Sequence, residues 1–163
     1  MTRFEIRDVD FSDPIHAQAI VDLIDAYASD PVGGGQPLPA QVRSRLVPGL
    51  QAHPSARVWL AFDDEVPIGI VVCFFGFSTF RARPLLNVHD LAVLPAMRGK
   101  GAGRALLREA ERHAREGGCC KLTLEVQEDN ARARGLYESF GFSDFQIGDS
   151  GPTRFLSKPI PPP

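Results

Sequence analysis

Long hydrophobic runs and an excess of either charge are both missing from this sequence. The longest apolar run, at residues 68–77, is about half the length needed to span a bilayer, and residues 1–10 lack the apolar stretch of a secretory signal. The 18 Lys and Arg nearly balance the 20 Asp and Glu, for a net charge of −2, so charge favours neither nucleic acid nor an anionic membrane as a partner. We therefore expect a soluble cytoplasmic protein.

Cysteine is scarce as well, with three among 163 residues, two of them adjacent at Cys119 and Cys120. This spacing suits neither a disulfide framework nor a zinc site, so we expect no bound metal. A chain of this length with 44% hydrophobic residues can bury one sizeable core. We expect a single domain over residues 1–158 and a proline-rich tail, "PIPPP", at 159–163.

Apolar periodicity predicts a mixed α+β fold. Alternating or continuous apolar runs predict strands at 4–9, on both sides of a tight turn at Asp64–Glu65 within 57–77, and at 86–93, 120–126 and 154–160. Helical spacing predicts helices at 13–30 with Asp13 as a candidate cap, at 40–53 with an interruption near Pro48, at 102–116 and at 130–140. The order begins with antiparallel strands and ends with a β-α-β crossover.

Three glycines stand within five residues, just before and at the start of the predicted helix at 102–116: Gly99, Gly101 and Gly103. A helix N-terminus offers unpaired N–H groups and the positive end of the helix dipole, which together bind anions. The interleaved basic residues Arg98, Lys100 and Arg104 add positive charge. The loop therefore predicts a ligand that carries pyrophosphate, and a flexible turn before an ordinary helix is the alternative.

Two common phosphate loops do not fit this stretch. A Walker loop needs Ser or Thr after Gly-Lys, whereas Lys100 is followed by Gly101. A Rossmann fingerprint needs a glycine where Arg104 stands, and it follows the first strand of a βαβ repeat. A different phosphate-binding pattern is required.

The sequence "RGKGAG" at 98–103 matches R/Q-x-x-G-x-G/A, and with it the chain resembles the GNAT family of N-acetyltransferases, whose coenzyme A loop has this pattern. "LTLEVQEDNARARGLYESFGF" (122–142) is similar to the family's next strand and helix, and "FGFSTFRARPLLNVHDLAV" (75–93) resembles its diamine and small-amine branch. The resemblance covers residues 57–142. It implies acetyl-CoA as cofactor and a mostly antiparallel mixed sheet of six to seven strands, flanked by about four helices, with a splayed strand pair that binds coenzyme A.

The resemblance also implies which residues hold the cofactor. Main-chain groups of the strand before the loop bind the carbonyl and the pantetheine arm, the loop binds the pyrophosphate, and the last helix contributes further contacts. Asn130 or its neighbour Asp129 as a plain helix cap remains the alternative at that position. The implied cofactor residues are Leu91, Ala92, Val93, Arg98, Gly99, Lys100, Gly101, Ala102, Gly103, Arg104, Asn130, Ala133 and Tyr137.

Tyr137 is the candidate general acid by the same resemblance. It lies seven residues after Asn130, close to two helical turns, so both side chains can share one helix face. A phenol can donate a proton to the thiolate of coenzyme A as the carbon–sulfur bond breaks. The alternative is a tyrosine whose ring packs under the helix with its hydroxyl at the surface.

His89 and Asp90 are the candidates for the general base and for contact with the acceptor. Neighbours on a strand point to opposite faces unless a bulge intervenes. Related diamine acetyltransferases usually have Glu-Asp here, and His89 attracts a polycation less than a carboxylate would, which argues against polyamines. By resemblance, an acceptor pocket would be lined by Phe75, Phe77, Ser78 and Phe80.

Together these residues predict an acetyl-CoA-dependent N-acetyltransferase that acts on a primary amine of a small molecule by direct attack in a ternary complex. Acetylation of a protein at its N-terminus or at lysine is an alternative. A non-catalytic acyl-CoA-binding module is another. Because late strands often form dimers in this family, "RFLSKPI" (154–160) is interpreted as a blunted edge or an exchanged strand, and we expect a homodimer.

Overall fold

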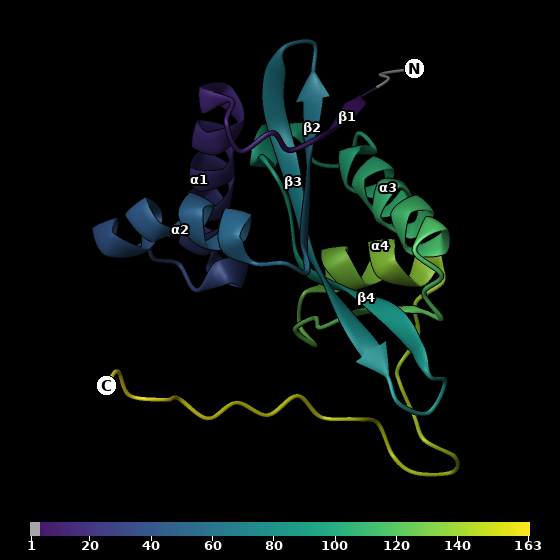
Figure 1. The fold of residues 1–163 in the computed structure, drawn as a ribbon. Coiled ribbons are helices and arrows are strands. Elements are labelled where there is room, and N and C mark those ends of the chain that lie inside the picture. Colours follow the sequence, from purple (N-terminus) through teal and green to yellow (C-terminus); the bar gives the residue numbers. More distant parts are fainter. Residues whose placement is uncertain (1–3) are drawn as a thin grey trace. The chain divides into compact units, whose positions relative to one another are not determined.

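The computed structural model describes residues 4–163, which fall into two compact units divided between Leu124 and Glu125. The single domain expected over 1–158 stays a prediction. The first unit holds a sheet with helices, and the second holds one helix and a long C-terminal segment (Figure 1). The elements in chain order are β1 (Glu5–Asp8), α1 (Pro14–Ser29), α2 (Ala40–Ala52), β2 (Ala56–Asp63), β3 (Val66–Ser78), β4 (Arg83–Val93), α3 (Ala102–Glu116), β5 (Leu122–Leu124) and α4 (Ala131–Phe140), with 3₁₀ turns at Pro31–Gly33 and Pro95–Met97.

The sheet has the order β1-β2-β3-β4-β5. Neighbouring strands are antiparallel from β1 to β4, and β4 and β5 are parallel because α3 carries the chain back between them. Asp64 adopts a positive φ of 54° at the tight turn between β2 and β3. The predicted antiparallel start, this turn and the β-α-β crossover are thereby confirmed.

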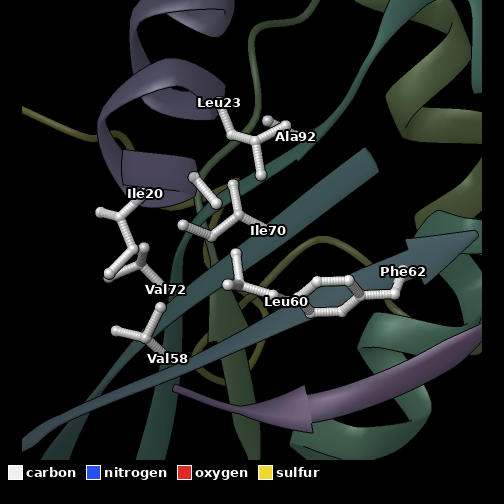
Figure 2. Close-up of a cluster of buried hydrophobic side chains, with 9 residues drawn as sticks. Ile20, Leu23, Val58, Leu60, Phe62, Ile70, Val72 and Ala92 are labelled. Atoms are coloured by element: carbon white, nitrogen blue, oxygen red, sulfur yellow. The ribbon is translucent and has the colours of Figure 1, made fainter. Parts of the chain in front are cut away.

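The core lies on both faces of β2 and β3. One face is covered by α1, and the other by α3, whose buried residues include Leu106, Leu107 and Ala110. On the α3 side, the ring of Trp59 meets His113 edge-on at 5.1 Å between centroids. Figure 2 shows part of the α1 side, which contains Ala19, Ile20, Leu23, Val58, Leu60, Phe62, Ile70, Val72 and Ala92.

Local sequence signals place the helices of the first unit. Asp13 caps α1 by accepting a hydrogen bond from the Ile15 amide at 2.8 Å, and Pro14 occupies the first helical position. The predicted helix at 102–116 coincides with α3. None of the helices within residues 4–163 is both long and apolar enough to cross a membrane.

The structure corrects two helix and strand predictions. The interruption expected at Pro48 is absent, since α2 runs through it from Ala40 to Ala52. Pro48 has no N–H to donate to the carbonyl of Ser44, one turn earlier. Both residues are exposed, so water can replace the missing hydrogen bond. The strand expected at 120–126 is only Leu122–Leu124.

The predicted strand at 154–160 does not form, and the described residues contain five strands rather than six to seven. Phe155, Leu156 and Ile160 are all largely exposed. Prolines at 152, 159 and 161–163 remove backbone donors around this segment. Alternation of side chains alone does not make a strand, because a strand also needs a neighbour to pair with.

Candidate functional site

A bulge in β4 brings His89 and Asp90 to the same face of the sheet. Val88 pairs with Cys73, and Asp90 pairs with Val72, the residue before Cys73 in β3. His89 has no pairing partner of its own in β3, so it is the extra residue of the bulge. Paired side chains share a face, and Val72 belongs to the core cluster under α1. Asp90 therefore faces the α1 side.

His89 lies on that face too. Its ring packs edge-on against Phe74, at 5.3 Å between centroids, and Phe74 packs against the core cluster on the α1 side. Nε2 of His89 lies 3.9 Å from Oδ2 of Asp90. The sequence left open whether His89 and Asp90 face opposite sides of the sheet or the same side. In the structure both face the α1 side.

Burial perturbs the acidity of Asp90 and of a tyrosine near it. The Asp90 side chain is only 28% exposed, and burial raises its pKa, while the neighbouring His89 acts in the opposite direction. The pKa of Tyr27, near the end of α1, is also raised, first by burial and then by the charges of Asp90 and Asp30. A carboxyl group with a raised pKa is better matched to proton transfer near neutral pH than an ordinary aspartate.

A partly buried ion pair joins the start of the glycine loop to the end of α1. The Arg98 guanidinium donates to Asp30 Oδ2 at 2.8 Å and to the Val93 carbonyl at 3.0 Å, and the two charged side chains are 22% and 14% exposed. These bonds use Nε and Nη2 of Arg98, and the predicted contact of its side chain with phosphate stays a prediction. In this structure the side chain holds the loop against β4 and α1.

We expect Asp30→Ala to lower the free energy of unfolding by about 2–3 kcal/mol. The substitution leaves the Arg98 cation without its ion-pair partner and removes the acceptor for the Val32 amide. Urea unfolding measures the loss. The exposed pair of Arg7 and Glu65 is the contrast, because Glu65→Ala should leave the free energy of unfolding nearly unchanged. Equal effects of the two substitutions would contradict this account of Asp30.

The glycine loop leads directly into α3. Gly99 and Gly101 have φ angles of +75° and +96°, which residues other than glycine rarely adopt. Gly101 is the N-cap and supplies no side-chain hydrogen bond to the helix. No side chain therefore caps the first backbone N–H groups of α3, which include those of Ala102 and Gly103. An anion can bind to N–H groups that are left open in this way.

The strand before the loop has one open edge. β4 pairs with β5 only from Leu86 to Val88, and Asn87 Nδ2 reinforces this section by donating to Thr123 Oγ1 at 3.0 Å. From Leu91 to Val93, β4 pairs with β3 alone among the described strands. Main-chain groups on the other edge are therefore placed where an extended ligand can bind to them.

The second unit carries the remaining predicted cofactor residues on α4. Asn130 is the N-cap, and its Oδ1 accepts a hydrogen bond from the Ala133 amide at 3.2 Å, which confirms the capping interpretation. Tyr137 is half-buried and meets Phe142 edge-on at 5.9 Å between centroids. Cofactor contacts by Asn130, Ala133 and Tyr137 stay predictions.

The acceptor residues suggested by resemblance are not brought to His89 and Asp90. Ser78 lies six residues along β3 from Val72, the partner of Asp90, which is about 20 Å in a strand. Phe77 is next to Ser78, and Phe80 follows in the exposed turn.

Phe75 lies on the opposite face of the sheet, where its ring contacts His113 at 5.7 Å. Its neighbour Phe74 is the aromatic residue beside His89. Sequence reasoning missed Phe74, Tyr27 and Asp30. Strand alternation would have separated Phe74 from Phe75, but no sequence signal pairs Asp30 with a loop 68 residues away.

Comparison with known proteins assigns a family to this arrangement. The family model described as "Acetyltransferase (GNAT) family" matches residues 20–142. The chain belongs to this family, as the glycine loop and the 122–142 segment predicted.

Curated relatives include both small-molecule and protein acetyltransferases by name. The chain is 32% identical over 77 residues to a Bos taurus thialysine N-epsilon-acetyltransferase, covering 47% of this chain and 45% of that one. It is 42% identical over 76 residues to the N-alpha-acetyltransferase RimI of Mycobacterium tuberculosis, covering 45% and 46%. The chain thus spans about half the length of these two relatives. A solved structure of a probable acetyltransferase shares the fold, with a TM-score of 0.76 at 22% identity, over 94% of this chain and 99% of that one.

Proposed function

We propose that this protein transfers an acetyl group from acetyl-CoA to the primary amine of a small molecule, by direct attack in a ternary complex. The observation that carries the proposal is the position of His89 and Asp90 on one face of β4. After a 3₁₀ turn, this strand is followed by a glycine-rich helix start that has no side-chain cap. Membership of the family and the similarity to an enzyme named for an amine substrate support it.

The residues of the loop fit the anionic part of acetyl-CoA. The N-cap position has no side chain, and nothing lies within 4 Å of where a Cβ would stand at Gly99 or Gly101. Lys100 is exposed beside them. Backbone amides and a cation can therefore hold a pyrophosphate without displacing protein atoms. When bound, acetyl-CoA supplies the activated thioester carbonyl.

In this proposal, Asp90 and His89 accept a proton from the acceptor. An amine with a pKa near 10 is mostly ammonium at pH 7, and deprotonation costs about 4 kcal/mol. The carboxyl group of Asp90, directly or through His89 or water, takes this proton so that the nitrogen lone pair can attack. A nitrogen–carbon bond forms and the carbon–sulfur bond breaks. In the proposal, Tyr137 donates a proton to the departing sulfur, and the second proton that the attacking nitrogen loses on becoming an amide restores the Tyr137 phenol through solvent.

Calorimetric titration with acetyl-CoA, beside NADH and ATP, tests the proposal first. Binding of acetyl-CoA alone, followed by release of free thiol when a panel of amines is added, is the expected result. Absence of acetyl-CoA binding would refute the proposal.

We expect Tyr137→Phe to lower kcat by about 100-fold or more while the Kd for acetyl-CoA stays within about twofold, because only proton donation is lost. Thiol-release kinetics and calorimetry measure the two quantities. Phe142→Leu serves as the packing control, since it changes the ring that Tyr137 contacts and keeps the hydroxyl. An unchanged kcat in Tyr137→Phe would remove the general acid from the scheme and favour a binding module.

A protein N-terminus is the second candidate acceptor. The similarity to the RimI enzyme, named an N-alpha-acetyltransferase, favours it. Short peptides with free N-termini belong in the same amine panel, and a kcat/KM higher for peptides than for every small amine would select this candidate.

A further inference from the structure

An open apolar hollow of about 370 Å³ lies between α2 and β3. Its lining is mostly hydrophobic, with the exposed cation of Arg45 and the amide of Gln41 among its polar groups. A hollow of this size can hold a small organic molecule. Its lining includes Arg45, Leu46, Gly49 and Leu50 from α2 and Phe74 from β3.

The hollow adjoins the site on β4 at one aromatic ring. Phe74 lines the hollow and its ring contacts His89 at 5.3 Å and His53 at 4.9 Å between centroids. Phe74 lies two residues along β3 from Val72, the partner of Asp90, and therefore about 7 Å away on the same face. A molecule whose amine lies at Asp90 can place its body over Phe74.

The positive charge of Arg45 at the hollow indicates a further property of the ligand. Arg43, two residues earlier on α2, forms an ion pair with Asp25 at 3.0 Å. The Arg45 side chain, by contrast, makes no ion pair or hydrogen bond within the described residues, 4–163, and lines the hollow. An unpaired guanidinium beside an apolar surface is suited to a carboxylate carried on an apolar body.

We propose that the acceptor is an amine on an apolar or aromatic body that carries a carboxylate at the end remote from the amine. This inference rests on the proposed function and specifies its substrate class. The body packs on Phe74, Leu46 and Leu50, and the carboxylate reaches Arg45. Polyamines are disfavoured, because their second ammonium group would lie on an apolar surface near a cation.

Three amines test the proposal: 4-(2-aminoethyl)benzoate, its uncharged analogue 2-(4-methylphenyl)ethylamine, and ethanolamine. We expect kcat/KM to be at least about tenfold higher for the two aromatic amines than for ethanolamine. The benzoate should exceed its uncharged analogue by about threefold, as an exposed ion pair allows. Calorimetry with each amine in the absence of acetyl-CoA should show the same order of affinity.

Gly49→Leu fills the hollow at a position where an added Cβ meets no atom within 4 Å. It should lower kcat/KM and affinity for both aromatic amines by about tenfold or more and leave ethanolamine within about twofold. Gly49→Ala is the matched control, because both substitutions favour the helix and only leucine occupies the space.

Arg45→Gln should abolish the advantage of the benzoate over its uncharged analogue. Arg108→Gln, which removes an exposed arginine on α3, should keep it. Equal turnover of all three amines, or aromatic amines unaffected by Gly49→Leu, would overturn the inference while leaving acetyl transfer intact. Failure of acetyl-CoA to bind would instead overturn the proposed function, and the acceptor assignment with it.

Discussion

Gly101→Glu is expected to raise the Kd for acetyl-CoA by at least about 100-fold. Gly101 adopts a φ of +96° as the N-cap of α3, so any side chain there is strained by about 1–2 kcal/mol. The larger effect is charge, since a carboxylate about 4 Å from a phosphate costs up to about 4 kcal/mol near a protein surface. Calorimetric titration of both proteins with acetyl-CoA measures the change.

Two variants separate charge from strain in this experiment. Gly101→Ala introduces the strain alone and should weaken binding by less than about tenfold. Gly118→Glu places the same carboxylate on a glycine with φ +70°, again in open space, but just beyond the opposite end of α3. If Gly118→Glu weakened acetyl-CoA binding as much as Gly101→Glu, the glycine loop would not be the pyrophosphate site.

Asp90→Asn is expected to lower kcat by about 10²–10⁴-fold, the range for loss of a general base. The acidic limb of the pH profile of kcat/KM should also change, because burial raises the pKa of Asp90 and the amide cannot titrate. Affinity for acetyl-CoA should stay within about twofold. Asp63→Asn, at the end of β2, is the control for the loss of one negative charge. The loss of kcat in His89→Gln measures how much of the proton transfer passes through the imidazole.

The same Asp90→Asn substitution should make the protein more stable at neutral pH. Because the native pKa of Asp90 is raised above its unfolded value, the native state binds more protons than the unfolded state between the two pKa values. Stability from this group is therefore present at low pH and is lost as the pH rises through the native pKa. Urea unfolding between pH 4 and 7 should show this loss in the wild type and less of it in Asp90→Asn. A variant that is less stable than the wild type at pH 7 would contradict the burial of this carboxylate.

Much of the fold was determined by local sequence. Asp13 and Pro14 define the start of α1, Asp64 forms the turn between β2 and β3, and the bounds of α3 follow from its apolar spacing. These features depend on residues within a few positions of one another, so a single sequence suffices to predict them. The glycine loop and the 122–142 segment likewise identified the family, because residues at fixed short spacing form the pattern.

Only the tertiary structure decided the features that depend on residues far apart in the sequence. The bulge that turns His89 and Asp90 to one face is defined by the pairing of β4 with β3. The Arg98 side chain was predicted to contact phosphate and is engaged by Asp30, which is remote in sequence. Phe74 rather than Phe77 lies beside His89, and the segment at 154–160 has the pattern of a strand but none of the pairing.

The physical reason is the same in each case. A cap, a turn or an amphipathic helix is stabilised by contacts that the local chain supplies itself. A bulge, a buried ion pair or a strand at the sheet edge gains its free energy from a second segment, whose position follows from the packing of the whole core. The sequence by itself determined the family and the loop, and the packing of β3, β4 and α1 decided which side chains meet beside it.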